Sequence, residues 1–326
     1  MLVETVRLDF PYCQVSMGAI EPKSRRSKEV FPGPGEQDIA QCATARRIAF
    51  SRRMPMEFHK MHANGDDFVI VDARGRSIAM TSPLACRLGN RHRGIGFNQL
   101  AMMSDGQDGH VELAFWNADG TPLDACGSAT RGVAHLLMRE TAQNCVFIRT
   151  KRGLLRCERR QRGTIAVDMG TPSLDWRDVP LAREADTLAL PLAGDPTACS
   201  MGNPHCTFFV DDLSRVDVAT VGPAMEMHPL FPQRTNVHFV EVLSRTHIRL
   251  RIWERGGGIP LGSGSCSCGA VVGGIRRGLL DERVVVVCDG GPVEVEWDGS
   301  GGVRLAGPVE HIYSGEIDRP MLDRAL

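Results

Sequence analysis

Two kinds of apolar spacing predict a chain of short strands with a few helices. The stretch HIRLRIWE alternates Ile248, Leu250 and Ile252 with two arginines, which is typical of a strand with one buried face. The run at 68–71, FVIV, follows an Asn-Gly turn and predicts a buried strand. The segments VVVVCDGG and PVEVEWDG predict two further strands joined by a hairpin-like turn.

Two other segments have the spacing or composition of helices. In SATRGVAHLLMRE, the residues Val133, Ala134 and Leu137 fall on one helical face. The apolar run CGAVVGGI, which begins at Cys268, predicts a second helix that is buried. Strands and helices together indicate an α/β protein.

Both helices belong to a longer internal repeat. The stretch WNADGTPLDACGSATRGVA, from Trp116, matches WERGGGIPLGSGSCSCGAVV, from Trp253, at an offset of 137 residues, the separation of Cys126 and Ser263. The same offset pairs Asn117 with Glu254, Gln99 with Asn236, and Asp66 with Asn203. We therefore expect two copies of one half, each presenting a small nucleophile-type residue, just before a Gly-Ser step, to a shared cleft.

Composition narrows the class of protein. The 326 residues, 42% of them hydrophobic, can bury a sizeable core, and the length fits two lobes. A formal net charge of -1 argues against nucleic acid or a membrane surface as the main partner, and no apolar run has the length of a membrane span. The 11 cysteines include no CxxC pair, so we expect reduced thiols in a cytoplasmic protein rather than disulfides or zinc.

The position that Cys126 holds in one half and Ser263 in the other suggests a role in proton transfer. Cys126 precedes Gly127, Ser128 and a helix, where free N–H groups and the positive end of the helix dipole favour a thiolate. The same donors can bind a substrate carboxylate. Ser263 precedes Gly264 and Ser265 in the same way. Two helix N-termini that meet here would clamp one carboxylate, with a side chain on either face of the adjacent carbon.

The chain resembles the diaminopimelate epimerase family from about Met56 to about Ile317. The resemblance rests on six motifs in the family's order: FHKMHANGDDFVIVD near 58, GIGFNQL at 94, NADG with Cys126, GNPH at 202, RTNVHFVEV at 234 and the WERGGG stretch. It implies cofactor-independent interconversion of LL- and meso-diaminopimelate by proton transfer at the α-carbon, a step of lysine and peptidoglycan precursor synthesis. It implies no cofactor and no metal.

The resemblance also implies the fold: two pseudo-symmetric lobes, each a mostly antiparallel sheet around a central helix, with the site between them. We expect an N-terminal lobe at 55–173, a C-terminal lobe at 174–306, and a segment at 307–320 that returns to the first lobe. Residues 1–54 hold basic and turn-rich stretches without an apolar period, and we expect a disordered extension or a start codon assigned too early. The sequence leaves open whether the chain forms a homodimer.

Site residues carry over from the family one by one. Cys126 and Ser263 occupy the two catalytic positions, and Arg255 is expected to pair with the distal carboxylate while Glu254 takes the ammonium. Asp66 stands where the family commonly has asparagine; a turn-capping aspartate is the alternative. The other predicted substrate-binding residues are Gln99, Asn117, Gly127, Ser128, Asn203, Asn236, Gly264 and Ser265. We expect His205 to brace its loop rather than act as an acid or base, and the linking region at 146–191 offers no catalytic candidate.

The second catalytic position departs from the family, which has cysteine where this chain has Ser263. A hydroxyl is a far weaker acid than a thiol, and a serine without a neighbouring base transfers protons poorly. Cys266, which replaces a family glycine, is a possible substitute, although its helical position points it elsewhere. Three hypotheses follow: a diaminopimelate epimerase, a one-base relative that acts as isomerase, dehydratase or racemase on another amino acid, and a homologue that binds an amino acid without turnover.

Overall fold

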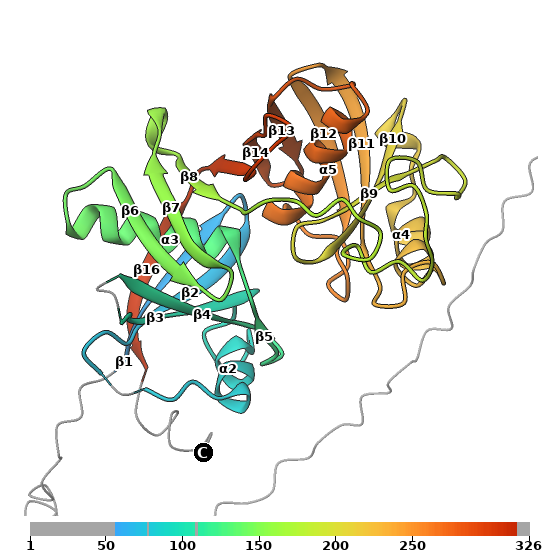
Figure 1. Ribbon diagram of the computed structural model, residues 1–326. Helices are drawn as coiled ribbons and strands as arrows, with labels where there is room; N and C mark the ends of the chain where they lie inside the picture. The colour runs from blue at the N-terminus through green and yellow to red at the C-terminus, as the bar shows by residue number, and fades with distance from the viewer. Residues whose placement is uncertain (1–55, 77, 108–109, 318–326) are drawn as a thin grey trace, which may run out of the picture. The chain divides into compact units, whose positions relative to one another are not determined.

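The computed structural model describes residues 56–76, 78–107 and 110–317. The predicted extension at 1–54 lies outside these residues. The described part is a mixed α/β fold dominated by strands, as the sequence predicts (Figure 1). Its helices are α2 (Ser82–Gly89), α3 (Gly127–Glu140), α4 (Val218–Glu226) and α5 (Gly264–Arg276), with 3-10 turns η2 (Gln161–Gly163) and η3 (Leu213–Arg215).

The strands fall into two series that follow one another along the chain. The first series is β1 (Met56–Ala63), β2 (Asp66–Asp72), β3 (Gln99–Asp105), β4 (Val111–Asn117), β5 (Pro122–Leu123), β6 (Cys145–Thr150), β7 (Gly153–Arg159) and β8 (Ile165–Asp168). The second is β9 (Thr197–Ser200), β10 (Pro204–Val210), β11 (Asn236–Ser244), β12 (His247–Trp253), β13 (Arg283–Cys288), β14 (Gly291–Glu296) and β15 (Arg304–Gly307). The last strand, β16 (Glu310–Ile317), pairs with β1.

The internal repeat is visible in the strand pairing. Within the first series, β2 with β3 and β4 with β6 are parallel, and their counterparts β10 with β11 and β12 with β13 are parallel too. The remaining pairings are antiparallel, including the β8–β15 pair that joins the two series. We call the elements around α3 the first lobe and those around α5 the second lobe. The predicted lobe boundaries remain a prediction.

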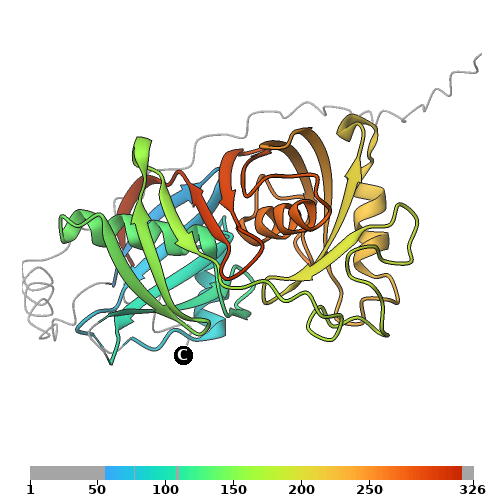
Figure 2. The same cartoon turned by 45° about the horizontal axis from the view of Figure 1, so that its top comes forward.

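Each lobe curls its strands around one helix. Helix α3 packs on β1, β2, β3, β6, β7 and β8, whereas α5 packs on β9 to β12, β14 and β15 (Figure 2). The predicted helical face of α3 is buried, with Val133, Ala134 and Leu137 in the core. Glycine lets α5 pack closely against the segment that follows it, because a Cβ at Gly274 would lie 2.3 Å from Leu280 Cδ1, between α5 and β13. This packing fixes where both helices begin, and therefore where the candidate site lies.

Local contacts join the edges of the two lobes. The Asn64 side-chain amide donates to the Pro292 carbonyl at 2.9 Å. Gly290 presses on the same turn, since a Cβ there would lie 2.0 Å from the Asn64 carbonyl oxygen. The nine cysteines of the described part are all free thiols. Among the described helices, none combines the length and the apolar character that a membrane crossing requires.

Candidate functional site

All thirteen residues that the sequence singles out line one cavity of about 590 Å³. Cys126 and Ser263 are both at its wall, together with Asp66, Gln99, Asn117, Gly127, Ser128, Asn203, Asn236, Glu254, Arg255, Gly264 and Ser265. They come from segments up to 199 positions apart, at Asp66 and Ser265. The structure thus assembles the predicted set, whose individual roles remain predictions.

Cys126 is the N-cap residue of α3. Its backbone is extended, and the Ala129 N–H donates to the sulfur at 3.4 Å. The thiol in turn donates to the Gln99 side-chain oxygen at 3.9 Å. The Thr130 hydroxyl donates to the Cys126 carbonyl at 2.7 Å and fixes the first turn. The sulfur therefore lies at the helix N-terminus, as predicted, with one donor and one acceptor beside it.

Ser263 occupies the same place on α5, with a difference. The Ser267 hydroxyl donates to the Ser263 carbonyl at 2.8 Å, which repeats the Thr130 contact of the first lobe. The Ser263 hydroxyl, however, makes no cap hydrogen bond to its own helix. It instead lies beside the Glu254 carboxylate and the Cys266 thiol. Burial raises the pKa of both groups, and the Ser263 hydroxyl partly offsets that rise. The hydroxyl is therefore linked to a potential base.

The thiol of Cys126 is not the low-pKa thiolate that the sequence predicts. Burial raises the pKa of Cys126 to about 12, and the Asp66 carboxylate raises it further, against smaller opposing effects of the Ala129 and Ser128 N–H groups and Arg131. The prediction weighed the helix N-terminus alone and could not include desolvation. The protein therefore holds Cys126 as a neutral thiol, which can give up a proton.

Burial also shifts the pKa of the Asp66 carboxyl group. It raises the pKa of Asp66, which hydrogen bonds from Asn98 and Ser128 and the charge of Arg131 only partly offset. The Asn98 amide donates to Asp66 at 3.0 Å. A protonated aspartic acid carries one donor and one acceptor oxygen, like an asparagine amide. In its protonated form, Asp66 would present the same donor and acceptor as the asparagine that is common in the family.

Several predicted amides are partly used by the protein itself. Asn117 donates to the Thr121 hydroxyl at 2.9 Å, so it also closes its own turn. Asn236 donates to the Pro204 carbonyl at 3.0 Å and accepts from the Arg255 N–H at 3.0 Å. These contacts set the walls of the cavity. Each amide therefore has fewer donors and acceptors left to bind a ligand.

A buried carboxylate holds the turn that carries Glu254 and Arg255. Glu226, at the end of α4, accepts from Trp253 Nε1 at 2.6 Å and from the Gly256 N–H at 2.9 Å, and it pairs with Arg234. The Arg255 guanidinium donates to the Gln233 carbonyl at 3.1 Å and is otherwise exposed toward the cavity. Glu226 was not predicted, because its role depends on segments brought together by folding.

Arg131 is a further charged residue that the sequence prediction omitted. It lies in the buried face of α3 with 2% exposure, and its Nε and Nη1 have no hydrogen-bond partner in the described part of the chain. Its Nη1 lies 3.9 Å from where a Cβ of Gly264 would be, at the start of α5. The guanidinium therefore adds positive charge behind both helix N-termini. An arginine within an apolar helical face was the available signal.

Arg152 lines the same cavity, although the linking region offered no candidate from sequence. Its guanidinium packs on Gly202, where a Cβ would meet Nη2 at 2.2 Å. A second, smaller cavity of about 220 Å³ shares Cys126 and Arg152 with the first. Arg152 sits in a turn without a motif, so nothing in the local sequence marks it.

Comparison with known proteins agrees with this geometry. The sequence model described as Diaminopimelate epimerase matches residues 58–174 and 197–312, one segment for each half of the repeat. A diaminopimelate epimerase of Acidiphilium cryptum is 45% identical over 269 residues, which cover 81% of this chain and 97% of the relative. One of Rhodospirillum centenum is 42% identical over 279 residues, 84% of this chain and 96% of the relative.

Solved structures share the fold at low sequence identity. A PhzF-family phenazine biosynthesis protein of Bacillus anthracis superposes with a TM-score of 0.59 at 17% identity, over 81% of this chain and 99% of that one. A hydroxyproline epimerase of Agrobacterium vitis superposes with a TM-score of 0.58 at 12% identity, over 83% of this chain and 95% of that one. The fold prediction is confirmed. With two matched halves, a cavity between the paired helix starts and relatives above 40% identity, this chain belongs to the diaminopimelate epimerase family.

Proposed function

We propose that this protein is a diaminopimelate epimerase that exchanges a proton at the substrate α-carbon between Cys126 and Ser263. The observation that carries the proposal is that both residues cap helices whose N-termini open into one cavity. Free N–H groups at both helix starts can bind the α-carboxylate, and the buried Arg131 adds to the positive potential. That charge stabilises the carbanion formed when the α-proton leaves.

The serine works with the carboxylate beside it. In one direction the Ser263 oxygen takes the α-proton while its own proton passes to Glu254, and the neutral Cys126 thiol protonates the opposite face. In the reverse direction the thiolate takes the proton, and Glu254 returns one through Ser263. The contact between Glu254 and Ser263 gives the hydroxyl the base that the sequence did not reveal. Before it accepts that proton, the charged Glu254 carboxylate can also pair with the distal ammonium group, as the sequence predicts.

The far end of the substrate meets the polar wall of the second lobe. Asn203 and Asn236 line the cavity there, and Arg255 offers a guanidinium to a carboxylate. This wall favours an amino acid with a second charged amino acid group at its distal end. A lysine lacks the distal carboxylate, and 2-aminopimelate lacks the distal ammonium, so both should be poorer substrates.

The test is turnover of LL-diaminopimelate by the purified chain, with the stereoisomers separated by chiral chromatography. We expect meso-diaminopimelate to accumulate toward equilibrium, with slower inversion of 2-aminopimelate and none of L-lysine. Exchange of the α-proton with retained configuration would indicate a one-base enzyme instead. Binding without any exchange would indicate a protein that holds its ligand without turnover.

A further inference from the structure

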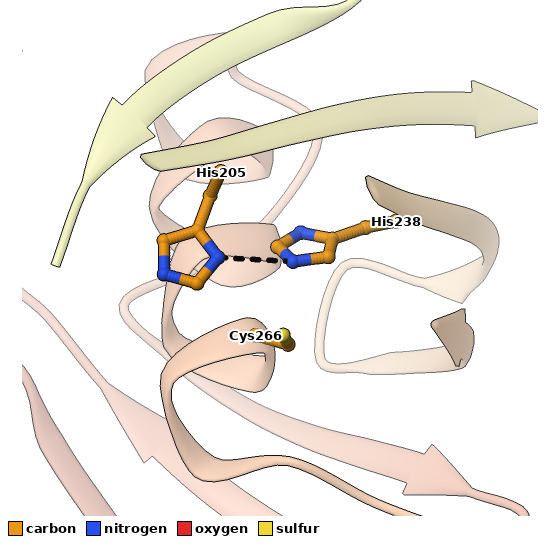
Figure 3. Close-up of side chains that lie close together, drawn as sticks. All are labelled: His205, His238 and Cys266. Atoms are coloured by element: carbon orange, nitrogen blue, oxygen red, sulfur yellow. Dashed lines mark hydrogen bonds between the residues drawn. The ribbon is translucent and has the colours of Figure 1, made fainter. Parts of the chain in front are cut away.

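Three buried side chains of the second lobe converge behind the cavity wall. His205 from β10, His238 from β11 and Cys266 from α5 each offer one ligand atom, and these atoms lie within 4.8 Å of one another (Figure 3). Both histidines and the cysteine are completely buried. The proposed reaction uses none of the three, so their grouping calls for its own explanation.

The first lobe shows that the fold does not need polar groups here. The repeat places Phe68 opposite His205, Ala101 opposite His238, and Ala129 opposite Cys266. These three residues are buried in the apolar core. One scaffold thus fills the same three positions with apolar side chains in one lobe and with metal-binding side chains in the other.

The outer nitrogens of both imidazoles have oxygen partners. His205 Nε2 is 2.9 Å from the Asn203 side-chain oxygen, and His238 Nδ1 is 3.0 Å from the Thr207 hydroxyl. When the outer nitrogen carries the proton, the inner one directs a lone pair at the centre of the cluster. Metal-bound histidines have this arrangement, with an oxygen that holds the ring from outside.

The distance between the two imidazoles fits a small tetrahedral ion. The inner nitrogens, His205 Nδ1 and His238 Nε2, lie 3.1 Å apart. Two imidazole nitrogens on a tetrahedral zinc ion, each about 2.05 Å from the metal, are roughly 3.3 Å apart. Gly269 gives both rings room, because a Cβ there would lie 3.0 Å from His205 Cγ and 3.2 Å from His238 Cε1.

We propose that His205, His238 and Cys266 bind a zinc ion. Two imidazoles and one thiolate form a donor set that suits Zn²⁺, which keeps its fourth position for water or another oxygen ligand. Binding releases the thiol proton, and the charge of the ion offsets the cost of burying a thiolate. The ion would hold His205 against Asn203, which lines the substrate cavity.

Without metal, the same groups form a hydrogen-bonded row. Thr207 would donate to His238, His238 to His205, and His205 to Asn203, which satisfies each ring nitrogen. Cys266 has no part in that row. Its substitution therefore separates the two explanations, since only the metal site depends on the thiol.

The matched variants are Cys266→Ala, which installs the residue of the first lobe, and Cys268→Ala on the same helix. Both thiols are buried, but only Cys266 belongs to the cluster. The full chain is produced with zinc and desalted, and its metal content is measured by mass spectrometry. We expect about one zinc per chain in the unchanged protein and in Cys268→Ala. Loss of one outer partner typically weakens binding 10–100-fold, so Cys266→Ala should lose more than about tenfold.

Two further measurements do not depend on the variant's stability. Cobalt(II) bound to the unchanged protein should give thiolate-to-metal charge-transfer absorption, which Cys268→Ala keeps. X-ray absorption at the zinc edge should report two nitrogen ligands and one sulfur ligand. Circular dichroism checks that each variant is folded. The proposal is overturned if the folded, unchanged protein retains no zinc, if Cys266→Ala binds it equally well, or if the edge spectrum lacks this ligand set.

Discussion

The two lobes share one backbone plan but present different atoms to the cavity. In the first lobe a thiol caps α3, accepts an N–H from its own helix and donates to Gln99. In the second lobe a hydroxyl stands at the start of α5, makes no cap hydrogen bond and lies beside Glu254 instead. The same position at a helix start can therefore hold either a proton donor that acts alone or one that acts with a neighbouring base.

The two lobes also differ in the side chains that lie behind Cys126 and Ser263. The first lobe has the buried guanidinium of Arg131, whose Nε and Nη1 have no hydrogen-bond partner among the described residues, where the second has the Cys268 thiol at the equivalent place. The second lobe has the histidine and cysteine cluster where the first is apolar. Repetition of the fold therefore fixed the positions of the helix starts and left the chemistry of each half free to diverge.

Removal of the Cys126 thiol should have the largest effect on the rate of epimerisation. Cys126→Ala deletes the proton donor of one face, and general acid–base catalysis contributes typically 10²–10⁴-fold, so we expect kcat to fall about 10³-fold. The measurement is the rate of meso-diaminopimelate formation from the LL isomer. Cys145→Ala, at a free thiol that does not line the cavity, is the control. A variant within tenfold of the unchanged protein would exclude Cys126 as a reacting group.

A second thiol should make the two lobes chemically alike. Ser263→Cys replaces a weak acid by a stronger one in the same place, and we expect kcat to rise by about 10²-fold. Ser265→Cys, two residues further along the chain and also at the cavity wall, tests whether a thiol anywhere on this wall is enough. No gain with Ser263→Cys would mean that the serine and Glu254 already form an adapted pair.

A smaller effect is expected at Asp66. Burial raises the pKa of Asp66, so its neutral form is lost as the pH rises through that raised value. The charge then raises the pKa of Cys126 and repels the substrate carboxylate. Asp66→Asn removes this ionisation, so its kcat/KM relative to the unchanged protein should grow with pH, by about tenfold. A ratio that stays flat across the pH profile contradicts this role.

The smallest effect concerns the packing of the two central helices. A Cβ at Gly132 of α3 would lie 2.4 Å from the Phe68 ring, whereas one at Gly269 of α5 would lie 3.0 Å from His205. Overpacking costs about 1–3 kcal/mol, and the better helix propensity of alanine returns about 1 kcal/mol. Urea unfolding should therefore show Gly132→Ala destabilised by about 1–2 kcal/mol, and Gly269→Ala, whose Cβ would lie close to both histidine rings, destabilised less. Equal losses would contradict the tighter packing around α3.

Much of this comparison could be predicted from sequence. The offset between Cys126 and Ser263 predicted two halves, and the six motifs predicted the fold and the residues that meet in the cavity. The pKa of Cys126 could not be predicted, because it depends on burial by segments distant in sequence. Arg152 and Glu226 lie outside any motif, and only the folded chain brings them to the site. The Glu254 contact with Ser263 likewise required the geometry of a turn.

The most direct measurement is the fate of deuterium when LL-diaminopimelate is incubated with the protein in deuterated water. If Cys126 and Ser263 act on opposite faces of one carbon, early meso product should carry one deuterium at the inverted α-carbon, while the remaining LL substrate stays largely unlabelled. Deuterium that enters the LL isomer without inversion would show one group acting on one face, and would contradict the account.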